Sequence, residues 1–456
     1  YPKLEIEGGA GVRPHKNSIN NYCYPENPEA GIDLFLEKLV QETEKEHEDI
    51  LEQADETDAM FGELYSWYLR NPEYRSRVQK LVQSAFAGKP KDIISQSVAK
   101  ALYGEVSPYS ATRLERFAAC AFAHFLQYGM KLTERVEYEF KPMDMGNVMH
   151  EALESFAEEV RKRGMKWTEL TEQERNEIAD RCLDNIVADY GNTVLKSSAR
   201  NEYMIERTRR ILRRTVWALQ KQLEQGEFQP EGFEVTFGGG RIDRVDIMED
   251  QNKVYVKVID YKTGNTSFDL VYLYHGLQLQ LMIYLDGALR VEQKKYPDKE
   301  IIPAGVFYYN IKDPMIQEKI DADVEAVSAG LMKELKMNGL VQADPELVYR
   351  MDSSLGSIPV AFNKDGSFRK NSSVADRTQF AVLGRYVRTK IEKIRSSILE
   401  GDAEVSPYEL GKKNACTYCP YMTVCGFDRR LSGYEFRRLK NFSDEELWKA
   451  FDREAE

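Results

Sequence analysis

The fold is decided by two neighbouring stretches, Gly240-Arg-Ile-Asp-Arg-Val-Asp-Ile247 and Lys253-Val-Tyr-Val-Lys-Val-Ile-Asp260. Both are rich in β-branched residues and alternate in polarity, which is the pattern of a strand. The polar residues 249–252 lie between them and have the length of a hairpin loop. The sequence therefore predicts two antiparallel strands joined by a tight turn.

Further elements surround this hairpin. A strand is predicted before it at 233–237, and another follows at 305–309, with a helix from Gly276 to about Val291 in between. The order strand–strand–strand–helix–strand lies inside an otherwise helical chain. That order predicts a mixed α/β core.

The rest of the chain divides into a helical start and a longer remainder. Residues 1–31 are expected to be irregular, and 341–375 are expected to form a long loop. Apolar periodicity predicts helices over 32–101, 110–120, 148–160, 174–222 and 378–399. A Gly/Pro break at 104–108 places a boundary there, so we expect a mostly helical segment at 1–105 and a second domain at 106–456.

Composition excludes several classes of protein. The 456 residues, with 42% hydrophobic side chains, suffice for two to three domains, and no long apolar run predicts a membrane span. The chain lacks a phosphate-binding loop, so ATP hydrolysis by this chain alone is not expected. Six cysteines are too few for a disulfide scaffold and favour a cytoplasmic, reducing compartment. The chain begins at Tyr1 without Met, as a fragment or processed form would.

The hairpin carries the residues best suited to chemistry. Asp243 and Asp260 lie on its two strands and are expected to converge at one end of the sheet. Two carboxylates there form an oxygen-rich site for Mg²⁺ or Mn²⁺. Lys262 shares a face with Asp260 because side chains alternate along a strand, and it could hold an attacking water. Ordinary exposed charges on two edge strands remain the alternative.

Five arginines fall within 207–214, in a protein of net charge −12. On a helix, Arg207, Arg210 and Arg214 share a face, which makes them candidates for contacts with DNA phosphates. Arg209 and Arg213 form an adjacent stripe. The alternative is a solvated helix face.

The cysteines are unevenly spaced. Cys416, Cys419 and Cys425 are close together, and Cys120 lies almost 300 residues upstream. Four thiolates of this kind suit either zinc or a [4Fe–4S] cluster, and spacing alone leaves both open. Cys23 and Cys182 fall outside the pattern and are expected to be free thiols.

Several motifs together resemble the PD-(D/E)xK nuclease superfamily in its RecB-like branch. Besides the hairpin residues, they are Gly146-Asn-Val-Met-His150 and Gln280-Leu-Met-Ile-Tyr284, with Gln278 as a second choice for the glutamine. The resemblance implies a restriction-endonuclease-like mixed sheet flanked by helices. It implies that His150, Asp243, Asp260 and the Tyr261 carbonyl bind the metal. It also implies that Lys262 activates water, supported by Gln280 and Tyr284.

The cysteine arrangement resembles the iron–sulfur nucleases of that branch, and among them the AddB family. The segments that carry this are Ser110–Glu115 with Cys120, and Ala415-Cys-Thr-Tyr-Cys-Pro-Tyr421 with Cys425. Ala121 departs from the family, which usually has proline there. The resemblance implies a [4Fe–4S] cluster on the four cysteines that ties the ends of the domain together.

The AddB resemblance also implies a setting. An AddA-like helicase–nuclease subunit and DNA, in single-stranded form at a processed end, would be the partners. The chain would cut the 5′-terminated strand during resection of double-strand ends for recombinational repair, and 1–105 would be the tail of a helicase-like region. Three alternatives remain: a stand-alone iron–sulfur nuclease for single-stranded DNA, a non-catalytic DNA-binding scaffold, and a zinc-stabilised interaction protein.

Overall fold

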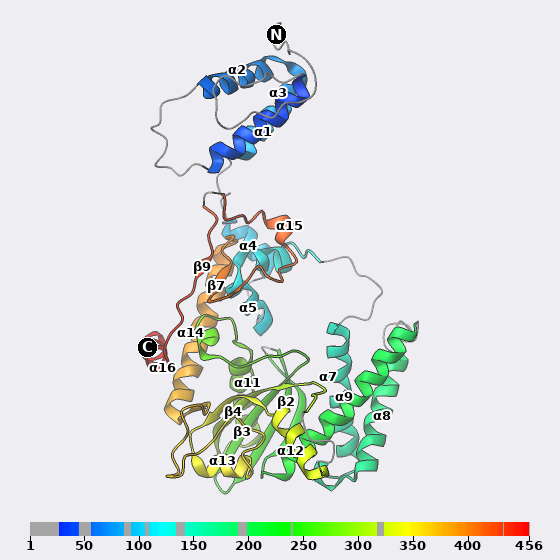
Figure 1. The fold of residues 1–456 in the computed structure, drawn as a ribbon. Coiled ribbons are helices and arrows are strands. Elements are labelled where there is room, and N and C mark those ends of the chain that lie inside the picture. The colour runs from blue at the N-terminus through cyan, green and yellow to red at the C-terminus, as the bar shows by residue number, and fades with distance from the viewer. Residues whose placement is uncertain are drawn as a thin grey trace. The chain divides into compact units, whose positions relative to one another are not determined.

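The computed structural model describes residues 27–44, 56–85, 93–104, 109–133, 142–189, 198–238, 240–316, 323–431 and 433–455 (Figure 1). Cys23 and most of the predicted irregular start lie outside these residues, as do residues 105–108 of the predicted boundary. The chain separates into two compact units. One comprises residues up to 92 with 404–406 and 422–437, and the other comprises 93–403, 407–421 and 438–456.

The smaller unit contains a helical core. Its helices are α1 (Pro28–Glu44), α2 (Glu56–Arg70), α3 (Pro72–Ala85) and the short α15 (Met422–Cys425). Apolar side chains of α1, α2 and α3 pack together, and Tyr68 lies at the centre of this core with no exposed surface. The Tyr68 hydroxyl donates a hydrogen bond to the Pro28 carbonyl at 2.6 Å, which joins α2 to the start of α1.

The larger unit is built on a six-stranded mixed sheet. Its strands, in spatial and chain order, are β1 (Gln229–Phe237), β2 (Gly240–Asp250), β3 (Lys253–Lys262), β4 (Glu300–Asn310), β5 (Asn338–Gln342) and β6 (Val374–Ala375). β3 pairs with β4, and β5 with β6, in parallel; the other neighbours are antiparallel. The predicted mixed α/β core is confirmed.

Helices cover both faces of this sheet (Figure 1). One core joins it to α7 (Pro142–Lys162), α8 (Glu172–Asp189), α9 (Ala199–Glu224) and α13 (Pro345–Met351). The other core joins the opposite face to α4 (Gln96–Tyr103), α5 (Ala111–Ala119), α10 (Leu270–Tyr274), α11 (Gln280–Lys295), α14 (Arg377–Glu400) and α16 (Asp444–Ala455). Both faces are therefore buried, which explains why β2 and β3 are nearly continuous in buried residues.

Two sequence predictions were too coarse. The helix predicted over 174–222 is two helices, α8 and α9, which pack side by side. The loop predicted over 341–375 contains the end of β5, the helix α13 and the short strand β6. Asp344 explains the start of α13, because its carboxylate accepts hydrogen bonds from the backbone N–H groups of Glu346 and Leu347, ahead of an apolar stretch.

Smaller elements complete the larger unit. They are α6 (Ala121–His124), which follows α5 directly, α12 (Val324–Glu334), and the antiparallel pair β7 (Tyr408–Leu410) and β8 (Lys413–Asn414). A further short strand, β9, covers Arg437–Arg438. None of the helices in the described residues has the length and apolar character needed to cross a membrane.

Candidate metal site at the end of the sheet

Asp243 and Asp260 meet at the end of the β2–β3 hairpin. The register pairs Arg244 with Ile259, so the two aspartates occupy the next opposed positions. Both are buried, Asp243 at 8% and Asp260 at 1% exposure. The Asp243 carboxylate accepts a hydrogen bond from the Tyr261 backbone N–H at 2.7 Å. Hairpin geometry thus brings together the two carboxylates expected from the sequence.

Lys262 connects Asp260 to helix α11. Its ammonium lies 2.6 Å from the Asp260 carboxylate and donates a hydrogen bond to the Gln280 side-chain carbonyl at 2.7 Å. The Gln280 amide in turn donates to the Tyr284 hydroxyl at 2.9 Å. Gln278 instead bonds the Ser267 carbonyl, so it is Gln280 that contacts the lysine. The result is a continuous polar chain from the carboxylate pair into α11.

His150 reaches the same site from α7. Its Nδ1 lies 3.3 Å from the Asp243 carboxylate, and its Nε2 lies 3.1 Å from the Tyr261 carbonyl. Burial lowers the pKa of His150, but hydrogen bonds to Asp243 and Glu234 outweigh it and raise the pKa to about 10. The ring therefore sits among oxygen atoms that favour positive charge, whether a proton or a metal ion supplies it.

Besides His150, Asp243 and Asp260, the site contains a fourth side chain that could bind a metal ion, Glu234 on β1. This residue was not predicted from the sequence. Its carboxylate lies 3.9 Å from His150 Nδ1 and is paired with Arg241. Its backbone φ is +49°, a left-handed conformation that is costly outside glycine. Phe233 and Val235 consequently pack on opposite faces of the sheet, which the usual two-residue alternation would not allow. Strained backbone of this kind is enriched at active sites and ligand-binding sites of proteins in general.

The arrangement supplies donors for a metal ion. His150, Glu234 and Asp243 each offer a ligand atom, and these atoms lie within 4.8 Å of one another. It is the one such group of three found among the described residues. Carboxylate oxygens suit Mg²⁺ and Mn²⁺, whereas imidazole is a donor more typical of ions such as Zn²⁺ and Fe²⁺. The carboxyl of Asp260 lies outside this group, where the ammonium of Lys262 neutralises it.

Glu115 positions the start of α11. Its carboxylate accepts hydrogen bonds from the backbone N–H groups of Leu279 and Gln280, at 2.7 and 2.9 Å. These are free donors at a helix N-terminus, where a negative charge is also favoured by the helix dipole. Burial raises the pKa of Glu115 to about 7 against these hydrogen bonds. Glu115 thereby fixes the helix end that carries Gln280.

A buried ionic cluster supports the hairpin beneath the site. Arg244 is 1% exposed and donates two hydrogen bonds to the Asp246 carboxylate, at 2.6 and 2.9 Å. Lys257 from β3 lies 3.0 Å from the same carboxylate. The Arg244 guanidinium also lies 5.6 Å from the Trp167 ring and 5.7 Å from the Phe233 ring. The cluster ties β2 to β3 and to the residues around β1.

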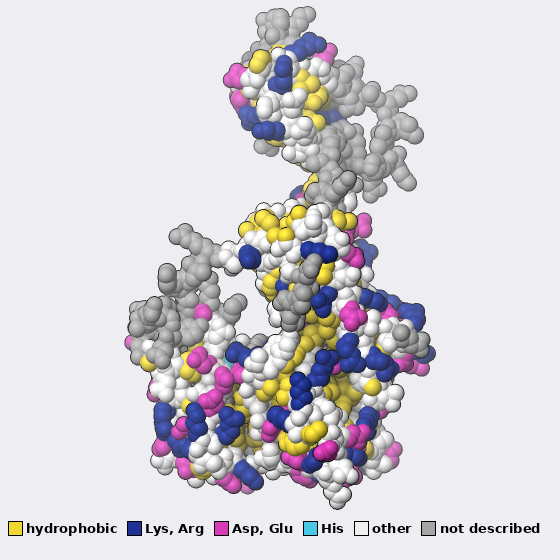
Figure 2. All heavy atoms as spheres, turned by 180° about the vertical axis from the view of Figure 1, so that it is seen from behind, with side chains coloured by type: hydrophobic (Ala, Val, Ile, Leu, Met, Phe, Trp, Pro, Cys, Tyr) yellow, Lys and Arg dark blue, Asp and Glu magenta, His cyan; other side chains and the backbone are white. Residues whose placement is uncertain are grey.

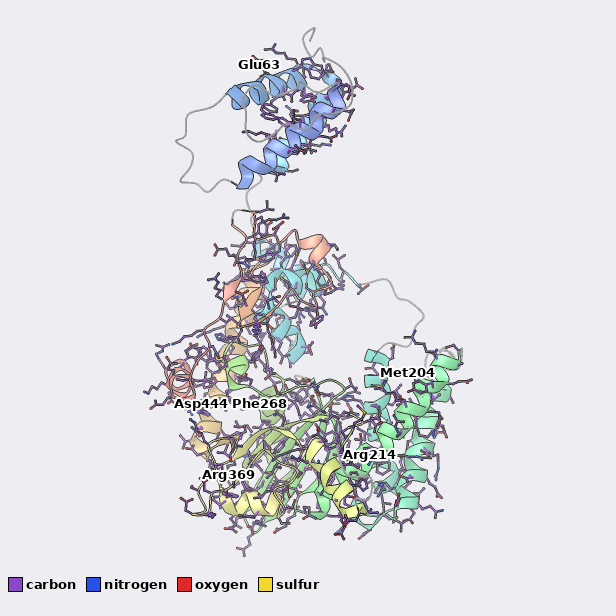
Figure 3. All side chains as sticks on the ribbon, in the orientation of Figure 1. Glu63, Met204, Arg214, Phe268, Arg369 and Asp444 are labelled. Atoms are coloured by element: carbon purple, nitrogen blue, oxygen red, sulfur yellow. The ribbon has the colours of Figure 1, made fainter. Side chains whose placement is uncertain are left out.

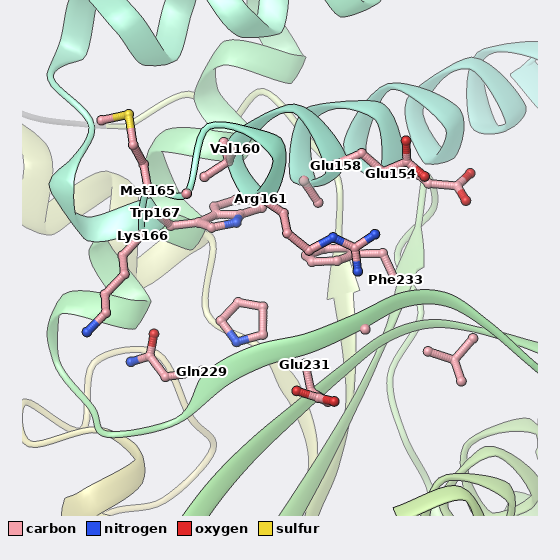
Figure 4. Close-up of a pocket in the computed structure, with 15 residues that line it drawn as sticks. Glu154, Glu158, Val160, Arg161, Met165, Lys166, Trp167, Gln229, Glu231 and Phe233 are labelled. Carbon is pink, nitrogen blue, oxygen red and sulfur yellow. The ribbon is translucent and has the colours of Figure 1, made fainter. Parts of the chain in front are cut away.

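Trp167 and Phe233 also form part of a pocket of about 440 Å³ beside the site (Figure 4). Their rings are parallel, with centroids 5.8 Å apart. The pocket lies between α7 and β1, and Arg161 and Lys166 line it together with Glu154, Glu158 and Glu231. Three acids face two bases here, so the pocket has no surplus of positive charge that would favour an anionic ligand.

Two of the four cysteines lie in one apolar cluster. Cys120, at the junction of α5 and α6, packs with Tyr421, and Cys419 packs against the same cluster. The Tyr421 hydroxyl donates to the Leu132 carbonyl at 3.0 Å, which fixes the segment further. Cys120, Cys182, Cys416, Cys419 and Cys425 form no disulfide. For Cys182 this agrees with the expected free thiol, whose pKa is raised by burial.

The arginines of α9 are mostly engaged with acids. Arg209 and Arg213 pair with Asp180 on α8, and Arg210 pairs with Asp313 at 2.7 Å. Arg214 lies on α9 near α12 and is 5.7 Å from the Trp217 ring (Figure 3). The expected phosphate contacts of Arg207, Arg210 and Arg214 stay a prediction, and for Arg210 they would compete with an existing ion pair.

Residues 108–426 match the family model of the PD-(D/E)XK nuclease superfamily. The chain is 41% identical over 425 residues to the AddB-type component of an ATP-dependent helicase/deoxyribonuclease from Lachnoclostridium phytofermentans, covering 88% of this chain and 36% of that protein. The corresponding proteins of Thermoanaerobacter pseudethanolicus and Clostridium acetobutylicum are 34% and 33% identical, with 88% of this chain and 37% and 36% of theirs covered. The chain thus spans little more than a third of these relatives.

Proposed function

Because the chain belongs to the PD-(D/E)XK nuclease superfamily, we propose that it is a Mg²⁺- or Mn²⁺-dependent DNA exonuclease domain. The observation that carries this is the convergence of His150, Asp243, Asp260 and Lys262 at one end of the sheet. The homologous proteins are named for a helicase and deoxyribonuclease. We propose that this chain serves such an assembly, resecting double-strand ends and cutting the 5′-terminated strand.

The roles of the residues follow from their contacts. His150, Asp243, Asp260 and the Tyr261 carbonyl would hold the cation, with Glu234 as a further donor that the geometry adds. A bound divalent ion would supply Lewis-acid charge to the scissile phosphate. Burial keeps the carboxylates in place before substrate arrives, so the cation that they would hold is positioned in advance. Preorganised positive charge of this kind stabilises the negative charge that develops on the phosphate.

Lys262 is suited to orient the attacking water. An ammonium has three N–H donors, and two of them face Asp260 and Gln280. The third is left for the water or for a phosphate oxygen. Gln280 and Tyr284 hold the lysine from behind and so fix the direction of this donor. The lysine also lies 5.5 Å from the Tyr308 ring, which confines it on a further side.

We also propose that Cys120, Cys416, Cys419 and Cys425 hold a [4Fe–4S] cluster with a structural role. The packing of Cys120 and Cys419 against one apolar cluster fits soft thiolate ligands shielded from water. Such a cluster would close a loop of about 300 residues and so stabilise the fold. Zinc is the alternative metal, and it would give a colourless protein.

The remaining parts of the proposal concern the larger assembly. The chain spans little more than a third of its relatives, so the activity of a whole assembly is a proposal. We propose that residues 1–105 are the tail of a helicase-like region and that 106–456 are the nuclease domain. An AddA-like helicase–nuclease would be the partner that delivers single-stranded DNA at a processed end.

The test compares the wild type with Asp260→Asn, both purified without oxygen. DNA labelled separately at its 5′ and 3′ ends is incubated with Mg²⁺, with Mn²⁺ or with a chelator. We expect metal-dependent cutting by the wild type alone, and the two labels report the polarity. Cutting by Asp260→Asn would overturn the assigned site. If neither protein cuts, the assay is repeated with the helicase partner, and inactivity there would overturn the proposed nuclease.

A further inference from the structure

We infer that the groove between α11, α14 and the β1–β2 turn binds a stretch of the single-stranded DNA substrate beyond the scissile phosphate. This inference rests on the proposed nuclease function and names the substrate path of the same site. The groove has a volume of about 510 Å³. It is lined by Tyr109, Phe237, Arg290, Lys294, Arg388 and Arg395, among others.

The groove begins next to the candidate site. Phe237, at the end of β1, packs edge-on against Tyr284 with ring centroids 5.9 Å apart. Tyr284 accepts the hydrogen bond from Gln280, which in turn contacts Lys262. Phe237, an aromatic side chain of the groove, is therefore linked to Lys262 through three successive side-chain contacts. Neighbouring side chains thus connect the groove to the candidate site directly.

Positive charge exceeds negative charge in the groove. Four cationic side chains line it, against the single carboxylate of Asp286. Asp286 pairs with Arg290 at 2.7 Å and with Arg388 at 2.8 Å, and so holds both guanidinium groups at the rim. Lys294 is exposed and has no ion pair among the described residues. On a chain of net charge −12, this local surplus favours a polyanion.

The arginines of α9 are a weaker candidate for DNA binding than the groove. The arginines near α12 also line a pocket, but three of them are already paired with Asp180, Asp184 or Asp313. Neutralised arginines release few counterions when DNA binds, so they contribute little affinity. Figure 2 shows, on the face opposite to that of Figure 1, Lys and Arg side chains gathered beside a strip of hydrophobic side chains.

The groove is also apolar and aromatic, which favours single strands over duplex. Phe237 is only partly buried. Its ring can lie against residue 287 because Gly287 has no Cβ; a Cβ at this position would come within 2.6 Å of the ring. Tyr109 is buried and lies between the guanidinium groups of Arg113 and Arg395, so Phe237 is the aromatic lining residue that stays partly accessible. Exposed bases stack on aromatic and guanidinium planes, whereas a duplex keeps its bases inside. Cations beside an accessible aromatic ring are usual features of a single-strand site.

The length of α11 sets a size for the bound segment. The α11 residues that line the groove run from Met282 to Lys294, over which the helix rises by about 18 Å at 1.5 Å per residue. Stacked nucleotides repeat at about 3.4 Å, so about five of them would span the groove. Affinity should therefore increase with oligonucleotide length up to roughly this size and then level off.

The experiment measures binding without cleavage. The 456-residue chain carrying Asp260→Asn is titrated, in Ca²⁺, onto fluorescent oligothymidylates of about 4 and about 12 nucleotides. We expect the longer probe to bind about tenfold tighter. Lys294→Glu should lose most of this gain and reduce the slope of log affinity against log salt by about 1. Lys364→Glu makes the same change of charge on an exposed residue away from the groove, and should keep the gain.

Arg388→Ala serves as a second groove variant, since it removes charge without adding any. Circular dichroism checks that each variant is folded. If Lys294→Glu and Arg388→Ala bind the longer probe as tightly as Lys364→Glu does, the inference is wrong and the groove serves another ligand, such as a protein segment. Cleavage by the unsubstituted chain is measured separately. Absence of cleavage even with the helicase partner would contradict the proposed function without changing the binding result.

Discussion

The carboxyl of Asp260 illustrates how the site is held ready. Burial, together with the neighbouring Asp243, raises its pKa to about 7, and Lys262 opposes that shift. Two buried carboxylates side by side are costly unless positive charge lies between or beside them. His150, Lys262 and a divalent ion are the groups available for that purpose. The two carboxylates are thus the groups at this site whose burial costs most when no positive charge is near.

Glu234 gives the sharpest prediction about a single side chain. Glu234→Gln removes one charged donor from the group with His150 and Asp243 but keeps its size. We expect the Mg²⁺ concentration for half-maximal cleavage to rise by roughly tenfold or more, because such contacts contribute strongly to metal affinity. Metal titration of cleavage measures this.

The matched control for that prediction is Glu231→Gln on the same strand. Glu231 pairs with Lys295 at 2.8 Å and belongs to no metal group among the described residues. It should leave the metal requirement unchanged. An unchanged requirement in Glu234→Gln as well would assign Glu234 to pairing with Arg241 alone.

At the scale of the element, helix α11 depends on Glu115. Because burial raises the pKa of Glu115 from 4.5 to about 7, the folded state binds a proton that the unfolded state has lost between these values. Stability should therefore fall as the pH rises from 4.5 to 7. Glu115→Gln still accepts the hydrogen bonds of Leu279 and Gln280 but does not titrate, so its melting temperature should depend less on pH in this window.

Thermal unfolding in a chelator, from pH 4.5 to 8, compares that variant with the wild type. The exposed Glu325→Gln is the control and should follow the wild-type profile. Identical profiles for Glu115→Gln and the wild type would show that the carboxyl of Glu115 titrates normally.

The hairpin itself depends on the buried cluster of Arg244, Asp246 and Lys257. Asp246→Asn leaves two buried cations without their carboxylate, so we expect a loss of about 3–5 kcal/mol in the free energy of unfolding. Asp250→Asn breaks an ion pair with Arg350. Because the Asp250 side chain is 44% exposed, this change should cost less than about 1 kcal/mol. Denaturant titration of both variants decides, and equal losses would contradict a structural role for the cluster.

Sequence patterns predicted these elements better than the contacts between them. Alternation and a polar turn sufficed to place Asp243 opposite Asp260, because a hairpin register is local. Glu234 was missed because a strand prediction assumes that side chains alternate regularly between the two faces of the sheet. The left-handed backbone at Glu234 interrupts that alternation in the structure. The pairing of Arg210 with Asp313 joins residues about 100 positions apart, and helical periodicity carries no information about such contacts. The one available signal for Glu234 was that it is a lone carboxylate in the apolar strand before the hairpin.

At the scale of the whole molecule, the larger unit is assembled from distant segments. Cys120 precedes the sheet and Cys419 follows it, yet both pack against one apolar cluster. Residues this far apart pay a large loop entropy to meet, and a covalent or metal link between them stabilises the fold by constraining the unfolded chain. The proposed cluster would act at this point, and its effect would reach the catalytic end of the sheet only through global stability.

The last prediction follows from this position. Cys419→Ser should remove the visible absorbance of the anaerobically purified protein and lower its melting temperature, because the loop of about 300 residues is no longer closed. Cys182→Ala is the control, since Cys182 is also buried but packs between α7 and α8, in a different core. It should keep the colour. If the wild type is colourless and contains zinc, the metal at the cysteines is zinc and not an iron–sulfur cluster. If the spectrum of Cys419→Ser is unchanged, the Cys419 thiol is not a ligand.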